Sequence, residues 1–151
     1  MKINFKIATP EKVVYKDDVD SVTVPTEMGE ITILPNHIPL ISILKAGEII
    51  IRKGEGETTV SVAGGFLEVL STKVVVLADR AERSEEIDLE RAKVAMQRAT
   101  DLREQKAVDS REFAALTAQI EKELARIRVG RKHLRRIEQR GINIKDYEHK
   151  G

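Results

Sequence analysis

The chain has 151 residues, which is enough for one ordinary domain or for a compact domain with an appendage. It contains no cysteine, which excludes disulfides, thiolate chemistry and zinc-finger spacings. No apolar run approaches the roughly 18 residues that a membrane span needs, and the first residues do not resemble a signal peptide, so we expect a cytoplasmic location.

The net charge of +1 conceals an asymmetry between the two halves of the chain. Residues 1–86 contain 10 basic and 14 acidic side chains, whereas residues 87–151 contain 16 basic and 11 acidic ones. Charge that is separated in this way usually means that the two halves face different partners.

The first half of the chain has the pattern of short β-strands. In residues 2–8 the apolar side chains alternate with polar ones, which predicts a half-buried strand. Short apolar runs follow, and most are separated by turn signals such as Pro35-Asn36, Ala46-Gly47 and Gly64-Gly65. Many short strands with turns between them indicate an antiparallel β-sandwich, which we place at residues 1–84.

The second half has the pattern of two helices. From Phe66 to Val129 the sequence contains neither glycine nor proline, and from Leu89 onward small apolar residues recur every three or four positions. The first helix could be capped by Ser84 or by Asp88, and the sequence leaves both open. Its apolar stripe is mostly alanine, whose small side chain allows a neighbouring helix to approach closely.

A second helix is predicted to begin after Asp109, which can cap it. The short connection makes the two helices antiparallel neighbours. Gly130 predicts a bend or an end, although the pattern could continue to Gly141. We therefore expect an α+β chain with many short strands, a helical hairpin at 85–141 and a disordered tail at 142–151. Since a two-helix hairpin buries little surface alone, it needs either its own sandwich or another subunit to lie on, and a hairpin with both options is a switch.

Three motifs in this order carry a resemblance to a known family. They are Gly29-Glu-Ile-Thr-Ile-Leu-Pro-Asn-His-Ile-Pro-Leu40, Gly64-Gly-Phe-Leu-Glu-Val69, and the junction that runs from Asp79-Arg-Ala-Glu82 to Ile87-Asp-Leu-Glu-Arg-Ala92. The chain resembles the epsilon subunit of bacterial F-type ATP synthases over residues 2–129. It departs from the family pattern at Thr32 and Asn36, where glycine is usual, and in a longer tail after Gly130.

This resemblance implies a sandwich of about ten strands followed by two helices, in a non-catalytic subunit of the central stalk of the rotor. The sandwich would dock on the gamma subunit and on the membrane c-ring, so the chain would be a peripheral component at the cytoplasmic face of the bacterial plasma membrane. The helices would either fold onto the sandwich or extend toward the alpha and beta subunits of the catalytic head, where they block ATP hydrolysis. Glu30 and His37 bracket the loop that would contact the c-ring and gamma, although such residues could merely solvate a turn.

The resemblance also implies two regulatory sites. A nucleotide site for ATP would use an acid, the helix start and several arginines, namely Glu82, Ile87, Asp88, Arg91, Ala92, Arg98 and Arg126. An inhibitory contact with the beta subunit would use Arg126, Arg128, Arg131, Lys132 and Arg135. Each has a simpler interpretation, since Asp88 and Arg91 suit any helix start and a basic stretch can be a solvated helix face.

The sequence offers no catalytic site. Its three histidines lack carboxylate or hydroxyl partners at any motif spacing, and it shows neither a phosphate-binding glycine loop nor a metal-ligand cluster, so we expect no required cofactor and no metal. The alternative to the stalk subunit is a β-sandwich adaptor whose basic helical tail contacts nucleic acid. The family resemblance predicts no nucleic-acid partner.

Overall fold

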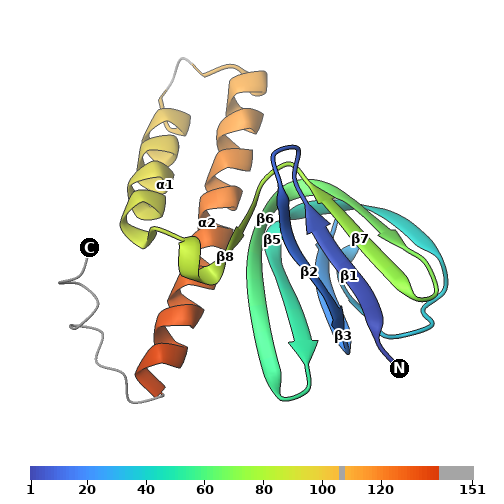
Figure 1. Cartoon of the computed structure of the whole chain (residues 1–151). Coiled ribbons are helices and arrows are strands. Elements are labelled where there is room, and N and C mark those ends of the chain that lie inside the picture. The colour runs from blue at the N-terminus through green and yellow to red at the C-terminus, as the bar shows by residue number, and fades with distance from the viewer. Residues whose placement is uncertain (106–107, 140–151) are drawn as a thin grey trace.

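The computed structural model describes residues 1–105 and 108–139 and places a β-sandwich beside a hairpin of two helices (Figure 1). Its strands are β1 (Ile3–Ala8), β2 (Val13–Val19), β3 (Ser21–Thr26), β4 (Gly29–Ile33), β5 (Leu40–Lys53), β6 (Gly56–Val69), β7 (Lys73–Ala78) and β8 (Ala81–Arg83). A 3-10 turn, η1 (Ser84–Glu86), leads to the helices α1 (Leu89–Arg103) and α2 (Ser110–Gln139). The predicted α+β fold is confirmed. Residues 140–151, which include Gly141 and the predicted tail 142–151, lie outside the described residues.

The strands follow the order β2-β1-β7-β6-β5-β3-β4, with β8 pairing on β6. The β1–β7 pair is parallel and the other pairs are antiparallel. One half of the long β5–β6 hairpin lies beside β7, and the other half lies between β3 and β8. The two long strands therefore connect both parts of the sandwich.

Two predicted turns lie inside strands. Ala46-Gly47 is within β5 and Gly64-Gly65 is within β6, so these strands each contain two of the expected short runs and the described residues form eight strands rather than about ten. The glycines permit close approach instead of a turn. Gly65 has φ +131°, and a Cβ there would lie 2.2 Å from the carbonyl oxygen of Leu77, while a Cβ on Gly47 would lie 2.9 Å from the Pro25 side chain.

The core of the sandwich is aliphatic and continuous. The alternation in β1 buries Ile3, Phe5 and Ile7, which are at most 1% exposed, and one cluster joins them to the inward-facing valines, leucines and isoleucines of the other strands. Complete burial of a Val, Leu, Ile or Phe side chain stabilises a fold by about 1.5–3 kcal/mol. This core lies within residues 3–78, separate from the helices.

Both helices begin next to cap residues that the sequence offers as candidates. Asp88 is the cap of α1, since its Oδ1 accepts a hydrogen bond from the Arg91 backbone N–H at 3.1 Å, and Asp109 Oδ1 accepts from the Glu112 N–H at 2.8 Å. The helix does not end at Gly130, and the alternative prediction that it continues is confirmed as far as Gln139. In Figure 1, α2 lies between α1 and the sandwich, and it contacts β5, β6 and η1. No helix among the described residues is long and apolar enough to cross a membrane.

Candidate functional site

The predicted nucleotide residues gather around the segment that joins the sandwich to α1. Asp88 is exposed and serves as the helix cap, while Ala92 is completely buried one turn later. Ile87 lies against α2, where a Cβ on Gly130 would come within 3.3 Å of its Cγ2. The motif is therefore at least a helix start packed on α2.

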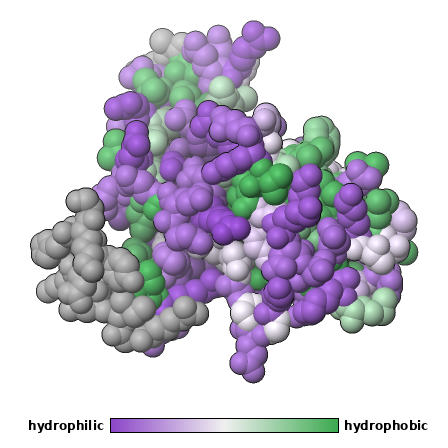
Figure 2. All heavy atoms as spheres, in the orientation of Figure 1, coloured by the Kyte–Doolittle hydropathy of each residue, from purple (hydrophilic) through white to green (hydrophobic). Residues whose placement is uncertain are grey.

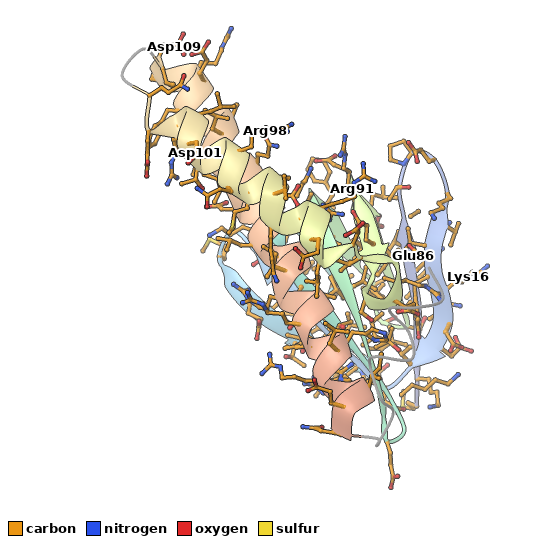
Figure 3. The ribbon with its side chains drawn as sticks, turned by 90° about the vertical axis from the view of Figure 1, so that its left-hand side faces the viewer. Lys16, Glu86, Arg91, Arg98, Asp101 and Asp109 are labelled. Carbon is orange, nitrogen blue, oxygen red and sulfur yellow. The ribbon has the colours of Figure 1, made fainter. Side chains whose placement is uncertain are left out.

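Arg91 and Arg98 belong to the exposed side of α1. They line an open groove of about 410 Å³ together with Glu90, Val94 and Ala95, all from the same helix. Figure 3 shows the two arginines along one side of α1, with Glu86 beyond the start of that helix near Arg91. This groove has an apolar floor between two cations, which suits an anion that carries an apolar ring.

Arg126 lies elsewhere, between α2 and β8. Its Nε is 3.0 Å from Glu82 Oε1, and its Nη1 is 2.7 Å from Glu123 Oε2. Lys122 adds a contact of 3.5 Å between its Nζ and Glu123 Oε1. Burial lowers the pKa of Arg126, but the bonds to Glu123 and Glu82 outweigh it and raise that pKa above its usual value. Of the predicted residues, the structure thus joins Glu82 to Arg126 and leaves Arg91 and Arg98 in a different groove.

Glu123 is a functional candidate that our interpretation of the sequence did not identify. Its side chain is 3% exposed, and its charge is held by Arg126 and Lys122. A signal was present, because Glu123 stands three residues after Ile120 and four before Ile127, on the apolar seam of α2. A carboxylate on such a seam must be paired, since burying it alone would cost several kcal/mol.

The basic stretch of α2 divides into two faces. Lys132 Nζ is 2.5 Å from Glu48 Oε1 on β5, and Arg136 pairs with the carboxylate of Glu57 on β6. Arg128, Arg131 and Arg135 are exposed and make no ion pair within residues 1–105 and 108–139. Their spacing of three and four residues places them together on the outer face of the helix.

An exposed apolar row crosses the sandwich, and the sequence patterns did not reveal it. Ile43 pairs with Phe66, which pairs with Leu77, so three side chains adjoin across β5, β6 and β7. They are 48%, 58% and 56% exposed. Figure 2 shows hydrophobic residues at the surface of the sandwich, some of them at the end away from the helices. An exposed apolar row of this kind is a candidate interaction site.

The loop bracketed by Glu30 and His37 is also at the surface. Glu30 is exposed on β4 opposite Pro25, and His37 Nδ1 lies 2.7 Å from the Ile38 carbonyl oxygen. Near these residues in sequence, Leu34 and Ile38 are strongly exposed. The loop therefore presents apolar side chains together with an acid and an imidazole.

Known proteins share both the sequence and the fold. The family model of the ATP synthase delta/epsilon chain β-sandwich domain matches residues 2–84. An ATP synthase epsilon chain of Chloroflexus aggregans is 43% identical over 133 residues, which cover 88% of this chain and 95% of that one. The epsilon chain of Syntrophobacter fumaroxidans is 42% identical over 131 residues, covering 87% and 97%.

A solved structure of the Euglena gracilis mitochondrial ATP synthase, comprising OSCP, F1 and the c-ring, contains a chain of the same fold. The TM-score is 0.72 at 20% identity, over 82% of this chain and 78% of that one. The fold of a sandwich followed by two helices agrees with the extensive sequence identity to the bacterial relatives. This chain therefore belongs to the family of ATP synthase epsilon chains.

Proposed function

We propose that this epsilon chain is a non-catalytic rotor subunit whose sandwich carries assembly into the ATP synthase and whose hairpin regulates ATP hydrolysis. The observation that carries the proposal is that the sandwich and the hairpin have surfaces of different chemistry. The sandwich has a self-contained core and an exposed apolar row, whereas the hairpin lies on it through charged contacts. The adaptor alternative has no support among the related proteins.

The sandwich offers two docking surfaces. The row of Ile43, Phe66 and Leu77 has the apolar character of a stable interface, and we assign it to the gamma subunit. The exposed side chains of the segment from Glu30, on β4, to His37, in the loop after it, form a second surface, which we assign to the c-ring. In this arrangement the chain is peripheral, at the cytoplasmic face of the bacterial plasma membrane.

The hairpin would act on the alpha and beta subunits of the catalytic head. Arg128, Arg131 and Arg135 already face outward and suit an acidic segment of the beta subunit. Arg126 and Lys132 are engaged with sandwich carboxylates, so they would join that contact only after the hairpin leaves the sandwich. Inhibition would therefore follow opening of the hairpin.

A variant truncated after residue 86 tests this division. It should copurify with the gamma subunit and support proton-coupled ATP synthesis, while the hydrolysis rate of its complex should exceed that of the full-length complex. A matched variant, Phe66→Ser in the full chain, should lose gamma instead. Failure of the truncated chain to bind gamma would refute the assignment of assembly to the sandwich, and an unchanged hydrolysis rate would refute the regulatory role.

ATP is the ligand that we propose for the groove on α1, as a regulator rather than a required cofactor. Arg91 and Arg98 would meet the phosphates, and Asp88 would accept from the adenine amine. Ala92 is completely buried and lines no part of this groove, so it would not contact the ring in this arrangement of the helices. Arg126 would take part only if nucleotide displaced Glu82 and Glu123 from it. A charge-assisted hydrogen bond contributes about 1.5–3 kcal/mol, so Arg91→Ala should weaken binding by roughly tenfold or more.

The role of Asp88 needs a variant that preserves the cap. Asp88→Ala removes both the carboxylate and the cap, whereas Asp88→Ser keeps a side-chain oxygen for the Arg91 N–H. If the carboxylate binds adenine, both variants should bind ATP more weakly in calorimetric titration. Equal affinity in the wild type, Asp88→Ser and Arg91→Ala would reduce the motif to a helix start.

A further inference from the structure

The segment of α2 after Gly130 lies on the sandwich without burying an apolar side chain. Before Gly130, α2 buries Ile120, Ala125, Ile127 and Val129. From residue 131 to 139 every side chain is half-buried or exposed. Hydrophobic burial therefore holds the first part of α2 far more strongly than the last part.

Ion pairs join this last segment to the sandwich. Lys132 Nζ lies 2.5 Å from Glu48 Oε1, and the Glu48 side chain is 9% exposed. One turn further on, Arg136 pairs with the Glu57 carboxylate, and its Nη1 donates to the Glu57 backbone oxygen at 3.3 Å. The two cations share one face of the helix, and the two acids lie on the adjacent strands β5 and β6.

The surface beneath α2 is polar and loosely packed. Glu48 pairs across the ladder with Ser61, and its Oε2 is buried without a hydrogen-bond partner among the described residues. An open groove of about 340 Å³ lies between this segment and the sandwich, lined by Glu57 and Thr58 of β6 and by His133 and Arg136 of α2. Opening would let water reach the unpaired carboxylate oxygen of Glu48. Hydration of this oxygen would offset part of the free energy that is lost when the ion pairs break.

We propose that the pairs Lys132–Glu48 and Arg136–Glu57 form an electrostatic latch, which holds residues 131–139 on the sandwich and makes opening of the hairpin depend on salt. The latch concerns the last part of α2, and its regulatory meaning rests on the proposed function of the hairpin. The pairs are partly exposed, so ions in solution screen them, with a Debye length of about 8 Å at physiological ionic strength. Raising the salt concentration should therefore open the hairpin, beginning with residues 131–139.

A distance measurement on the full-length chain tests the latch. The chain has no cysteine, so Glu55→Cys in the β5–β6 turn and Glu138→Cys near the end of α2 give two unique labelling sites. Pulsed electron resonance on spin labels at these sites would report closed and open populations. Lys132→Glu places like charges together and should raise the ratio of open to closed chains by about tenfold or more.

Two further variants control for general damage to the fold. The charge swap of Lys132→Glu with Glu48→Lys should restore the closed population, because it re-creates the pair in reverse. Arg131→Glu changes the same charge on the neighbouring outward position and should leave the population unchanged. If Lys132→Glu stays closed, if the swap fails to restore closure while the sandwich remains folded, or if Arg131→Glu opens the hairpin equally, the latch is refuted.

The latch and the proposed regulatory function are tested by different experiments, so one can be refuted without the other. The distance measurement uses the free chain and needs no other subunit, whereas regulation is measured as hydrolysis by the assembled complex. A chain that opens as expected but leaves hydrolysis unchanged would retain the latch and overturn the regulatory role. A chain that stays closed at all salt concentrations would overturn the latch and leave membership in the rotor untouched.

Discussion

Gly130 of α2 lies directly against Leu89 at the start of α1. A Cβ on Gly130 would be 2.7 Å from Leu89 Cδ2 and 3.0 Å from its Cγ. Glycine inside a helix costs about 1 kcal/mol relative to alanine, yet α2 is continuous through this position. Because Gly130 has no side chain, Ile87 in the junction and Leu89 at the start of α1 can pack directly against α2.

We therefore expect Gly130→Ala to give no gain in stability, or a net loss, in the wild-type chain. The higher helix propensity of alanine would be opposed by displacement of Leu89. In a Leu89→Ala background the two closest contacts are removed and only Ile87 Cγ2, at 3.3 Å, remains, so Gly130→Ala should then stabilise the hairpin by up to about 1 kcal/mol. A double-mutant cycle by urea unfolding measures this reversal, and additive effects would contradict the proposed contact.

Gly130 also shows what the sequence could not predict, namely whether a glycine marks a turn or a close contact. Alternation in residues 2–8 correctly predicted which side chains of β1 are buried, and the cap at Asp88 was one of two predicted candidates. Glycine at positions 47, 65 and 130 was interpreted as a turn or a helix end, because a local pattern does not distinguish a turn from close approach. The residues approached are Pro25, Leu77 and Leu89, and only the tertiary fold brings them near.

Loss of Arg126 should destabilise the junction strongly. The variant Arg126→Ala would leave Glu123 buried with only Lys122 at 3.5 Å, and breaking a buried ion pair from one side costs about 3–5 kcal/mol. We expect a value near the lower end because Lys122 remains. The matched control Arg128→Ala, on the outward face, should change the free energy of unfolding by less than about 0.5 kcal/mol. Equal effects in urea unfolding would mean that the buried pairing contributes little.

Phe66 and Leu67 are neighbours with opposite expected effects. Phe66 is 58% exposed, so Phe66→Ser should leave unfolding nearly unchanged but weaken association with the gamma subunit by tenfold or more. Leu67 is completely buried, and Leu67→Ala should cost about 2–5 kcal/mol of stability. Titration of gamma binding at a temperature where all variants are folded separates the two effects. Wild-type gamma affinity for Phe66→Ser would refute the docking row.

Acid should weaken the attachment of the β2–β3 segment to the end of β5. The hydrogen bond from Lys53 lowers the pKa of Asp17, and the Gly54 backbone N–H together with Lys2 lowers that of Asp20. Because both pKa values are depressed in the folded state, this stabilisation is present above the unfolded value near 3.8 and is lost as the pH falls below it. Urea unfolding between pH 6 and pH 3 should show a shallower pH dependence for Asp17→Asn with Asp20→Asn. Identical profiles would show that these bonds do not couple to folding.

The candidate site was predictable in part. The basic stretch of α2 is evident in the sequence, and helical periodicity alone would have divided it into two faces. The partners of the inner face were not predictable, since Glu48 and Glu57 lie on strands more than 75 residues away, and no local pattern links them to Lys132 and Arg136. The prediction that Arg126, Arg128, Arg131, Lys132 and Arg135 act together on the beta subunit remains open. In this structure Arg126 and Lys132 are paired with the sandwich, and the other three face outward.

This division of α2 predicts opposite effects on ATP hydrolysis from two changes of charge. Glu48→Lys repels Lys132 and should open the hairpin, so the complex should hydrolyse ATP more slowly than the wild type. Arg131→Gln with Arg135→Gln leaves the latch intact but removes the outward charges that would meet the beta subunit, so hydrolysis should be faster.

Salt screens both the latch and the contact with the beta subunit. The two can be distinguished because weakening the latch favours inhibition, whereas weakening the contact with the beta subunit relieves it. At low salt the latch should keep the wild-type hairpin closed, and Glu48→Lys should then differ most from the wild type. As salt rises, the wild type should approach Glu48→Lys as its own latch is screened, while the contact with the beta subunit weakens in both. The measurement is the hydrolysis rate of each assembled complex against salt concentration, with copurification of gamma confirming equal assembly. If both changes move hydrolysis in the same direction, the two faces of α2 do not have separate roles, because a single electrostatic function would then account for all of its cations.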